Sequence, residues 1–387
     1  MPLLKKAAAH GYFAAQVAIV NMYCNGEGVT RDYVEAEKWY RSAAHQGFAY
    51  GQAGLGFMYR NGQGVNQNPE EALKWFRLAA NQEIAEAQSA LGDMFYQGEG
   101  VPKDYAESLK YSRLAANQGL VEAQYNLGLM YCKGDMGFKD FIEALKWFRL
   151  AANQGMTEAQ VDLGMMYYNG EGVVQDYAEA RTWYQKAADQ GEARAQLNLG
   201  AMFRSGQGVS QDYLEAMKWF RVAAAQGLAE AQHNLGVMFC NGEGVPKDDM
   251  EAAKWYRLAA DQGLAQAQLS LGVILSNVAT SGSKDYLEAM KWLRMAADQG
   301  LAEAQHNLGV MFSSGQYVPS DYAEALKWFQ LAADQGLARA QTNLGFMYLK
   351  GFGVTRDQSE AARWFKSAAA QGDEEAQKYL DGMEHSN

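Results

Sequence analysis

The chain has 387 residues and a formal net charge of −11 at pH 7, with 48% hydrophobic and 20% charged residues. This composition is sufficient for a sizeable core and differs from that of a disordered chain. A negative charge without any run of basic residues argues against binding to nucleic acid or anionic membranes, and the lack of an apolar stretch of about 18 residues argues against membrane insertion.

A single pattern repeats along the chain with a period of 36 residues, and one step is a residue longer. All 9 tryptophans follow this period. The vacant position in their series is filled by Tyr111. Glutamines mark the same spacing at positions 16, 52, 88, 124, 160, 196, 232, 268, 305, 341 and 377. A fixed period of this length predicts a repeat architecture.

Each repeat is predicted to contain two helices, and the third repeat shows why. Apolar residues in 85–97 recur at helical spacing, and Gly98 follows where a helix end favours a left-handed residue. After a short glycine-containing loop, Asp104 and Glu107 match a capping box that opens a second helix. In the second repeat, Pro69 fits the first position of the second helix. We therefore expect an all-α fold in which antiparallel helix pairs bury their apolar faces on their neighbours.

The repeats predict one domain over residues 1–387. Residues 3–11 correspond to part of a second helix, ten full repeats occupy about 12–372, and 373–387 form a closing first helix and tail. Blocks 212–239 and 285–312 are nearly identical, which indicates duplication of a two-repeat block. Residues 1–11 do not resemble a signal peptide. This favours a cytoplasmic location, or a periplasmic or secreted one if an N-terminal segment is missing.

The pattern A-x-x-L-G-x-M-Y-x-x-G-x-G-V-x-x-D-Y-x-E-A-x-x-W-x-x-x-A-A-x-Q-G resembles the Sel1-like repeat family, most clearly in 159–191 and 231–263. The G-x-G-V loop distinguishes it from the related tetratricopeptide repeat. The resemblance covers about residues 3–383 and implies a right-handed α-solenoid whose first helices line a concave face. Known members are adaptors in signalling, in membrane-associated protein quality control and in contacts between bacteria and hosts.

Some repeats depart from the family pattern. The loop of the fourth repeat reads G-D-M-G, and Tyr317 replaces the second glycine of the ninth. The eighth repeat has lost G-x-G-V in residues 276–284 and gained one residue, so we expect a looser joint there. Ser281 and Lys284 in this loop match the S-x-x-K motif of penicillin-recognising enzymes. The partner motifs S-D-N and K-T-G are missing, so we interpret the match as chance.

Other chemical patterns in the repeats have structural interpretations. The recurring acidic pairs, such as Asp32 and Glu35, are interpreted as helix caps, and the glycine loops close helices where phosphate loops open them. The tryptophan and methionine series are assigned to the core. Cys24, Cys132 and Cys240 lie three repeats apart, too distant for disulfides, and are expected to be free thiols in a reducing compartment. No spacing indicates a metal site, and no cofactor is expected.

The variable outward positions of the first helices are the candidate binding residues, because the resemblance places these helices on the concave face. In the second to sixth repeats these positions carry aromatic and aliphatic residues, with an arginine at either side, a composition typical of binding hot spots. The candidate groove consists of Phe57, Arg60, Tyr96, Tyr125, Leu129, Val161, Met165, Tyr168, Leu197, Arg204 and His233. The alternative is that tightly curled repeats bury these side chains against one another.

These patterns favour a non-enzymatic scaffold or adaptor that binds a peptide or protein partner in the groove. Two alternatives remain open. One is an enzyme or enzyme subunit that uses the irregular loop 276–284, and the other is a structural spacer.

Overall fold

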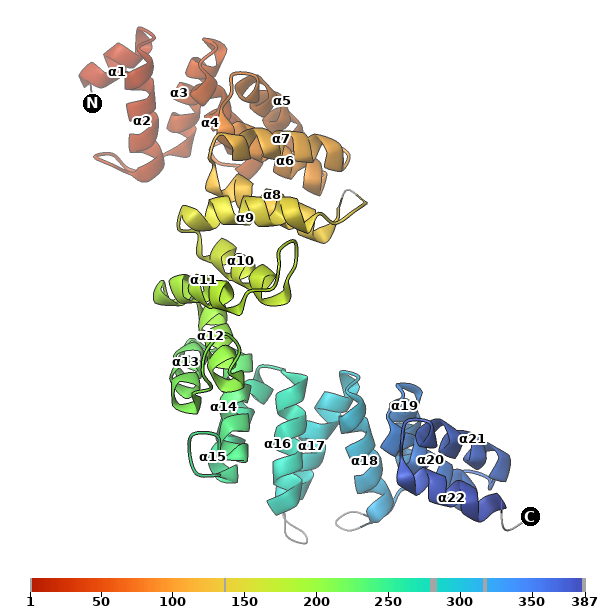
Figure 1. Ribbon diagram of the computed structural model, residues 1–387. Coiled ribbons are helices and arrows are strands. Elements are labelled where there is room, and N and C mark those ends of the chain that lie inside the picture. Colours follow the sequence, from red (N-terminus) through yellow and green to blue (C-terminus); the bar gives the residue numbers. More distant parts are fainter. Residues whose placement is uncertain (1, 136, 279–283, 316–318, 385–387) are drawn as a thin grey trace. The chain divides into compact units, whose positions relative to one another are not determined.

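The computed structural model describes residues 2–135, 137–278, 284–315 and 319–384, and every regular element within these ranges is a helix (Figure 1). The helices follow one another as antiparallel pairs with a repeat of about 36 residues, as an all-α solenoid requires. The chain divides into two compact units, residues 1–190 and 191–387. Each unit is described by itself below.

Unit 1 begins with a second-type helix, α1, and continues with five complete pairs. In each pair the even-numbered helix is the first helix and the odd-numbered helix is the second. The bounds are α1 Pro2–Ala9, α2 Phe13–Asn25, α3 Tyr33–His45, α4 Ala49–Asn61, α5 Pro69–Ala80, α6 Ala85–Gln97, α7 Tyr105–Asn117, α8 Val121–Lys133, α9 Phe141–Asn153, α10 Thr157–Asn169 and α11 Tyr177–Asp189.

Unit 2 contains five further pairs and ends with a first-type helix, α22. The bounds are α12 Ala193–Ser205, α13 Tyr213–Ala225, α14 Ala229–Asn241, α15 Asp249–Asp261, α16 Ala265–Val278, α17 Lys284–Asp298, α18 Ala302–Ser314, α19 Tyr322–Asp334, α20 Ala338–Lys350, α21 Gln358–Ala369 and α22 Glu374–Glu384.

Small residues bring the two helices of a pair close together. Gly128 of α8 faces the ring of Phe148 in α9, and a Cβ on this glycine would lie 2.6 Å from that ring. Phe148 is 1% exposed as a result. Gly200 and Phe220 repeat the arrangement in unit 2. Glycine at this position therefore makes room for one of the largest fully buried side chains.

The tryptophan series is less uniformly buried than the sequence predicted. Trp147, Trp183, Trp292, Trp328 and Trp364 are buried, whereas the other four are half-buried. The methionine series is buried at most positions, including Met58, Met94, Met130, Met166, Met202 and Met238. Both series pack between helices, and the tryptophans lie nearer the edge of the interface between those helices.

The predicted capping residues begin the second helices. Asp104 precedes α7, and its carboxylate accepts hydrogen bonds from the backbone N–H groups of Ala106 and Glu107, both at 3.0 Å. Asn68 caps α5, with Pro69 as the first helical residue. The eighth repeat differs, because α17 begins at Lys284 and Asp285 lies inside its first turn. Residues 279–283, which hold Ser281, lie outside the described residues.

The repeated glutamines join each repeat to the next. Gln124 donates to the backbone carbonyl of Ala116 at 3.1 Å and accepts a hydrogen bond from Gln154 of the following second helix at 2.9 Å. The same pair of bonds recurs at Gln88 and Gln232. Buried amides that are paired in this way fix the spacing between successive helix pairs.

Candidate functional site

The candidate groove residues lie on the first helices of both units, on the sides that contact the next repeat. In unit 1, Phe57 packs edge-on against Phe76, with ring centroids 4.8 Å apart. Tyr96 and Tyr168 pack in the same way on Tyr105 and Tyr177 of the second helices that follow them. Each aromatic group is therefore held by its own repeat while part of its surface stays exposed.

Most of these side chains are half-buried, and two lie at the extremes. Val161 is 1% exposed and belongs to the core of α10, whereas Met165, one turn later on the same helix, is 37% exposed. Residues four apart on a helix share a face, so these two neighbours on one face of α10 differ sharply in exposure. The half-buried members are Phe57, Arg60, Tyr96, Tyr125, Leu129, Tyr168, Leu197, Arg204 and His233.

Near the C-termini of the first helices, the polar ends of long side chains bind to the loop of the next repeat. Arg60 Nε donates to Glu99 Oε2 at 2.8 Å, and the hydroxyl of Tyr96 donates to Asp135 Oδ2 at 2.8 Å. In unit 2, Arg204 makes two hydrogen bonds to Glu243, at 2.6 and 3.0 Å. The three pairs share one separation, a repeat plus three residues. Each loop therefore ties down a side chain of the preceding first helix.

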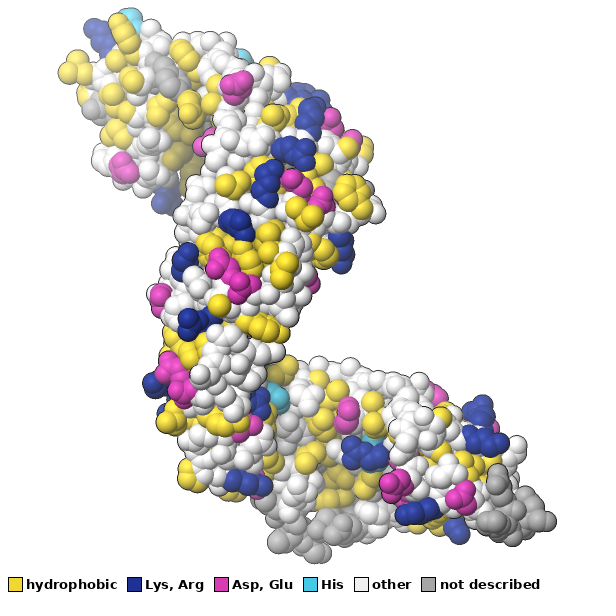
Figure 2. All heavy atoms as spheres, in the orientation of Figure 1, with side chains coloured by type: hydrophobic (Ala, Val, Ile, Leu, Met, Phe, Trp, Pro, Cys, Tyr) yellow, Lys and Arg dark blue, Asp and Glu magenta, His cyan; other side chains and the backbone are white. Residues whose placement is uncertain are grey.

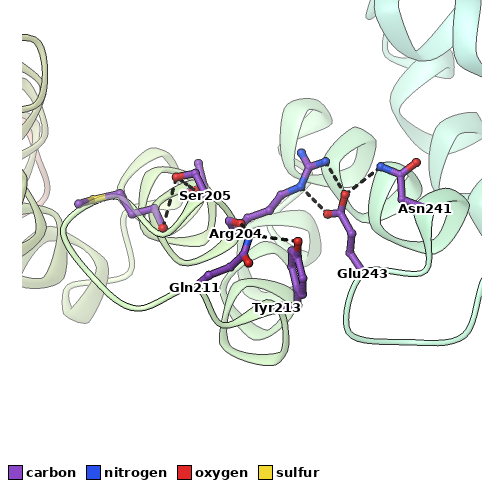
Figure 3. A network of polar contacts seen from close by, with 8 residues as sticks. Arg204, Ser205, Gln211, Tyr213, Asn241 and Glu243 are labelled. Atoms are coloured by element: carbon purple, nitrogen blue, oxygen red, sulfur yellow. Dashed lines mark hydrogen bonds and ion pairs between the residues drawn. The ribbon is translucent and has the colours of Figure 1, made fainter.

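Figure 3 shows the Arg204 bridge in detail. The guanidinium of Arg204 points from α12 toward Glu243 in the loop after α14, and Asn241 donates to the same carboxylate at 2.8 Å. The backbone carbonyl of Arg204 accepts from Gln211 at 2.9 Å, and Gln211 also contacts the hydroxyl of Tyr213. The arginine is thus held at both its backbone and its side chain.

A second set of bridges connects the middles of neighbouring first helices. The Tyr125 hydroxyl donates to Asp162 Oδ2 at 3.0 Å, and the Tyr125 ring packs against Phe148. In unit 2, His233 Nε2 lies 3.4 Å from Ser270 Oγ, and the His233 ring packs against Tyr256. Tyrosine and histidine at this position therefore span the distance to the next repeat.

Burial and these bridges set the ionisation of the site. Arg204 holds the pKa of the Glu243 carboxyl below its ordinary value by hydrogen bonding. Hydrogen bonding to Asp135 raises the pKa of Tyr96 to about 12. Burial lowers the pKa of His233 and raises that of Asp93 beside Arg60.

The acidic partners of the bridges were not identified from the sequence. Glu99 and Glu243 occupy the middle position of the G-x-G loops, and Asp135 lies just after the loop glycine of the fourth repeat. The available signal was an arginine or tyrosine at the end of one first helix, followed at a constant distance by an acid. It becomes meaningful only once the loop is known to fold back over the preceding helix.

The cysteines and the possible metal ligands are the other candidates that the sequence raised. Cys24, Cys132 and Cys240 are free, and burial raises the pKa of each thiol, so they are poor nucleophiles. Among the described residues, no group of three or more His, Cys, Asp and Glu side chains could hold a metal ion. No helix in the same part of the chain is long and apolar enough to span a membrane.

Comparison with known families and structures agrees with this architecture. A family model described as Sel1 repeat matches the chain in ten segments: 13–48, 49–83, 85–120, 121–156, 157–192, 193–228, 229–264, 265–301, 302–337 and 338–373. No curated protein matches the chain.

Two solved structures are similar over most of the chain. One is c5321, a protective antigen of uropathogenic Escherichia coli strains that displays an SLR fold; its TM-score is 0.87 at 36% identity, over 100% of this chain and 83% of c5321. The other is a Sel1 repeat protein from Oxalobacter formigenes, with a TM-score of 0.64 at 34% identity, over 80% of this chain and 90% of that one.

Proposed function

Because the chain belongs to the Sel1 repeat family, whose members are generally protein-interaction scaffolds, we propose that it is a non-catalytic adaptor that binds a peptide or protein on its first helices. The surface is the first-helix row, defined in unit 1 by Phe57, Tyr96, Tyr125, Leu129, Met165 and Tyr168. In unit 2, Leu197, Arg204 and His233 occupy the corresponding positions.

The observation that supports this proposal is that hydrogen bonds hold two aromatic side chains of the row in place. Tyr96 and Tyr125 are held at their hydroxyl ends by Asp135 and Asp162. Both rings remain partly exposed. A partner therefore meets apolar ring faces whose side-chain entropy is already reduced, which lowers the cost of binding. Aromatic anchors of this kind are common hot spots in interfaces.

Exposed aliphatic residues on the second helices offer a control. Leu114 of α7 and Leu150 of α9 are 43% and 40% exposed, similar to Met165 at 37%. Changes at these positions remove comparable apolar surface from a different side of the same repeats. They separate binding by the first-helix row from non-specific adhesion.

A photo-crosslinking experiment tests the proposal. A photoreactive amino acid replaces Leu129 in the full chain, and in the control it replaces Leu114. We expect discrete partners to be captured through position 129 and lost when Tyr125 and Met165 are changed to serine. Circular dichroism verifies that each variant is folded. Equal capture through positions 129 and 114 would contradict the proposal.

A further inference from the structure

The first two repeats contain a cavity. It arises because several of their residues differ from those at the equivalent positions of the other repeats. It has a volume of about 450 Å³ and lies between α2, α3, α4 and the start of α6, all within unit 1. Figure 2 shows hydrophobic side chains exposed over this end of the unit. The walls are mainly apolar and aromatic, formed by Val17, Val20, Tyr40, Tyr50, Phe57 and Ile84.

The first of these differences is at position 20. Val20 of α2 occupies the position that is glycine in all later repeats, such as Gly56 and Gly128. In most of those repeats the glycine accepts the aromatic ring of the paired second helix, and Phe76 and Phe148 are buried there. The exceptions are Gly92, which faces Ser112, and Gly272, which faces Leu293. The side chain of Val20 fills this space in the first repeat. The ring of Tyr40, which corresponds to Phe76, must therefore lie elsewhere.

Gly54 provides the alternative place for this ring. A Cβ on Gly54 would overlap the Tyr40 ring, so the ring lies directly against the backbone of α4. The equivalent position carries a side chain in every other repeat, for example Ala90, Asn126 and Asp162. Tyr40 remains half-buried and lines the cavity. The valine and the glycine thus act together to leave an aromatic-walled space.

A polar group with unused capacity also lines the cavity. Gln16 is 1% exposed, and its Nε2 donates to the carbonyl of Ala8 at 3.2 Å and toward Ser42 Oγ at 3.4 Å. Its Oε1 has no hydrogen-bond partner among the described residues. In later repeats this oxygen accepts from the glutamine of the following second helix, but the corresponding Gln46 donates to Ser42 instead. A buried acceptor left unpaired is costly, and a donor inserted beside it would recover that energy.

We propose that this cavity binds the tryptophan side chain of a partner protein, which deepens the proposed scaffold function and rests on it. An indole has a large apolar body and a single N–H donor, which matches apolar walls with one unused acceptor. Phenylalanine lacks the donor. Arginine would bury a charge, and the one carboxylate among the lining residues, that of Glu86, is exposed to solvent and does not lie beside the buried Gln16. Glu86, an exposed residue of α6 that also lines the cavity, favours a basic residue next to the tryptophan.

The test uses the full chain and three capped tripeptides, Lys-Trp-Lys, Lys-(1-methyl-Trp)-Lys and Lys-Phe-Lys, observed by ligand NMR titration. Methylation of the indole nitrogen removes only the donor. We expect the tryptophan peptide to bind about fivefold more tightly than the methylated peptide, since one hydrogen bond to a buried acceptor contributes a factor of this size. Equal binding of all three peptides, or no binding, overturns the proposal.

Two matched substitutions locate the site. Gln16→Met removes the unused acceptor, and Gln124→Met removes the same residue type from a repeat where it is fully paired. The first variant should lose the preference for tryptophan over 1-methyl-tryptophan, and the second should keep it. Persistence of the preference in Gln16→Met would contradict the assignment. If Gln16→Met disturbs α1–α3, the peptide comparison on the unaltered chain still decides.

The outcome is separable from that of the scaffold proposal. If partners are captured through Leu129 while the tripeptides show no preference, the cavity assignment is wrong and the scaffold function stands. If the tripeptides bind as expected but position 129 captures nothing, the first-helix row is wrong and the cavity remains a binding site.

Discussion

At the scale of single residues, bridges between repeats decide which part of each side chain is available. Arg60, Tyr96 and Arg204 are bound at their polar ends by an acid of the following loop. Most side chains of the candidate groove are neither fully exposed nor fully buried between repeats. The polar tips are engaged in the bridges, whereas much of the apolar surface stays half-exposed. Substitutions at the bridges therefore test rigidity separately from contact.

The Arg204–Glu243 bridge predicts a pH-dependent contribution to stability. Because the folded-state pKa of Glu243 is lowered, its contribution is complete above the ordinary pKa of 4.5 and is lost as the pH falls through the folded-state value. Glu243→Gln should lower the free energy of unfolding by up to about 1 kcal/mol at pH 7. Urea unfolding at pH 7 and at successively lower pH measures the difference, which should shrink on acidification. Glu230→Gln on α14 is the control, and a pH-independent difference for Glu243→Gln would contradict the prediction.

The uneven burial of the tryptophans gives a second prediction. Trp147 is 3% exposed and donates from Nε1 to Glu143 at 3.0 Å, whereas Trp75 is half-buried. Trp147→Ala should lower the free energy of unfolding by about 3–5 kcal/mol, because it leaves a cavity. Trp75→Ala should cost clearly less, since part of its ring already contacts water. Denaturant unfolding of both variants measures the two costs, and equal costs would show that exposure does not determine them.

At the scale of elements, the second helices depend on the cap that precedes them. The Asp104 carboxylate accepts hydrogen bonds from two backbone N–H groups of α7. Asn68 caps α5 with one hydrogen bond, which its side-chain oxygen accepts from the backbone N–H of Glu71. An amide can therefore perform this role in the same architecture. The negative charge adds a favourable interaction with the positive end of the helix dipole.

Two substitutions of the same cap separate hydrogen bonding from charge. Asp104→Ala removes the acceptor and should lower the free energy of unfolding by about 1 kcal/mol. Asp104→Asn keeps an acceptor and should cost only a few tenths of that, as the dipole interaction alone is weakened. Thermal and urea unfolding measure both. If the asparagine variant is as unstable as the alanine variant, the charge and not the hydrogen bond carries the cap.

At the scale of the whole molecule, helices contact mainly their neighbours in the chain. Within each unit, each first helix from α2 to α10 and from α14 to α20 packs on its own second helix and on the second helix before it. Stability in such a fold is approximately a sum of repeat terms and nearest-neighbour terms. The length of the array is therefore less critical than the completeness of each repeat.

Deletion of one complete repeat tests this independence. Removal of residues 121–156, one Sel1 repeat match, joins equivalent positions and should leave a cooperative, helical protein. Removal of residues 121–138 deletes α8 alone and leaves the apolar face of α9 without its partner. We expect this second variant to aggregate or unfold at a lower temperature. Circular dichroism melting of both proteins measures the outcome, and equal stability would contradict nearest-neighbour pairing.

The sequence by itself determined the repeat length, the helix pairs, most of the caps and the burial of most of the methionine series, whereas four tryptophans assigned to the core are half-buried. These features depend on local periodicity and on residues a few positions apart, so they are legible in each repeat. The three free cysteines followed from the same spacing. The bridges, the cavity of the first two repeats and the different burial of Val161 and Met165 were not predicted. They depend on how one repeat packs against the next.

The nearly identical blocks 212–239 and 285–312 show what only the tertiary structure decided. Asp212 caps α13 from outside the helix, whereas the equivalent Asp285 lies inside α17, because the segments that precede the two blocks differ. His233 forms a hydrogen-bond contact with Ser270, whereas the equivalent His306 forms one with Asn343 of the repeat that follows it. The same residues acquire different partners because contacts across a repeat boundary are supplied by the neighbour, and a local sequence pattern contains no information about that neighbour.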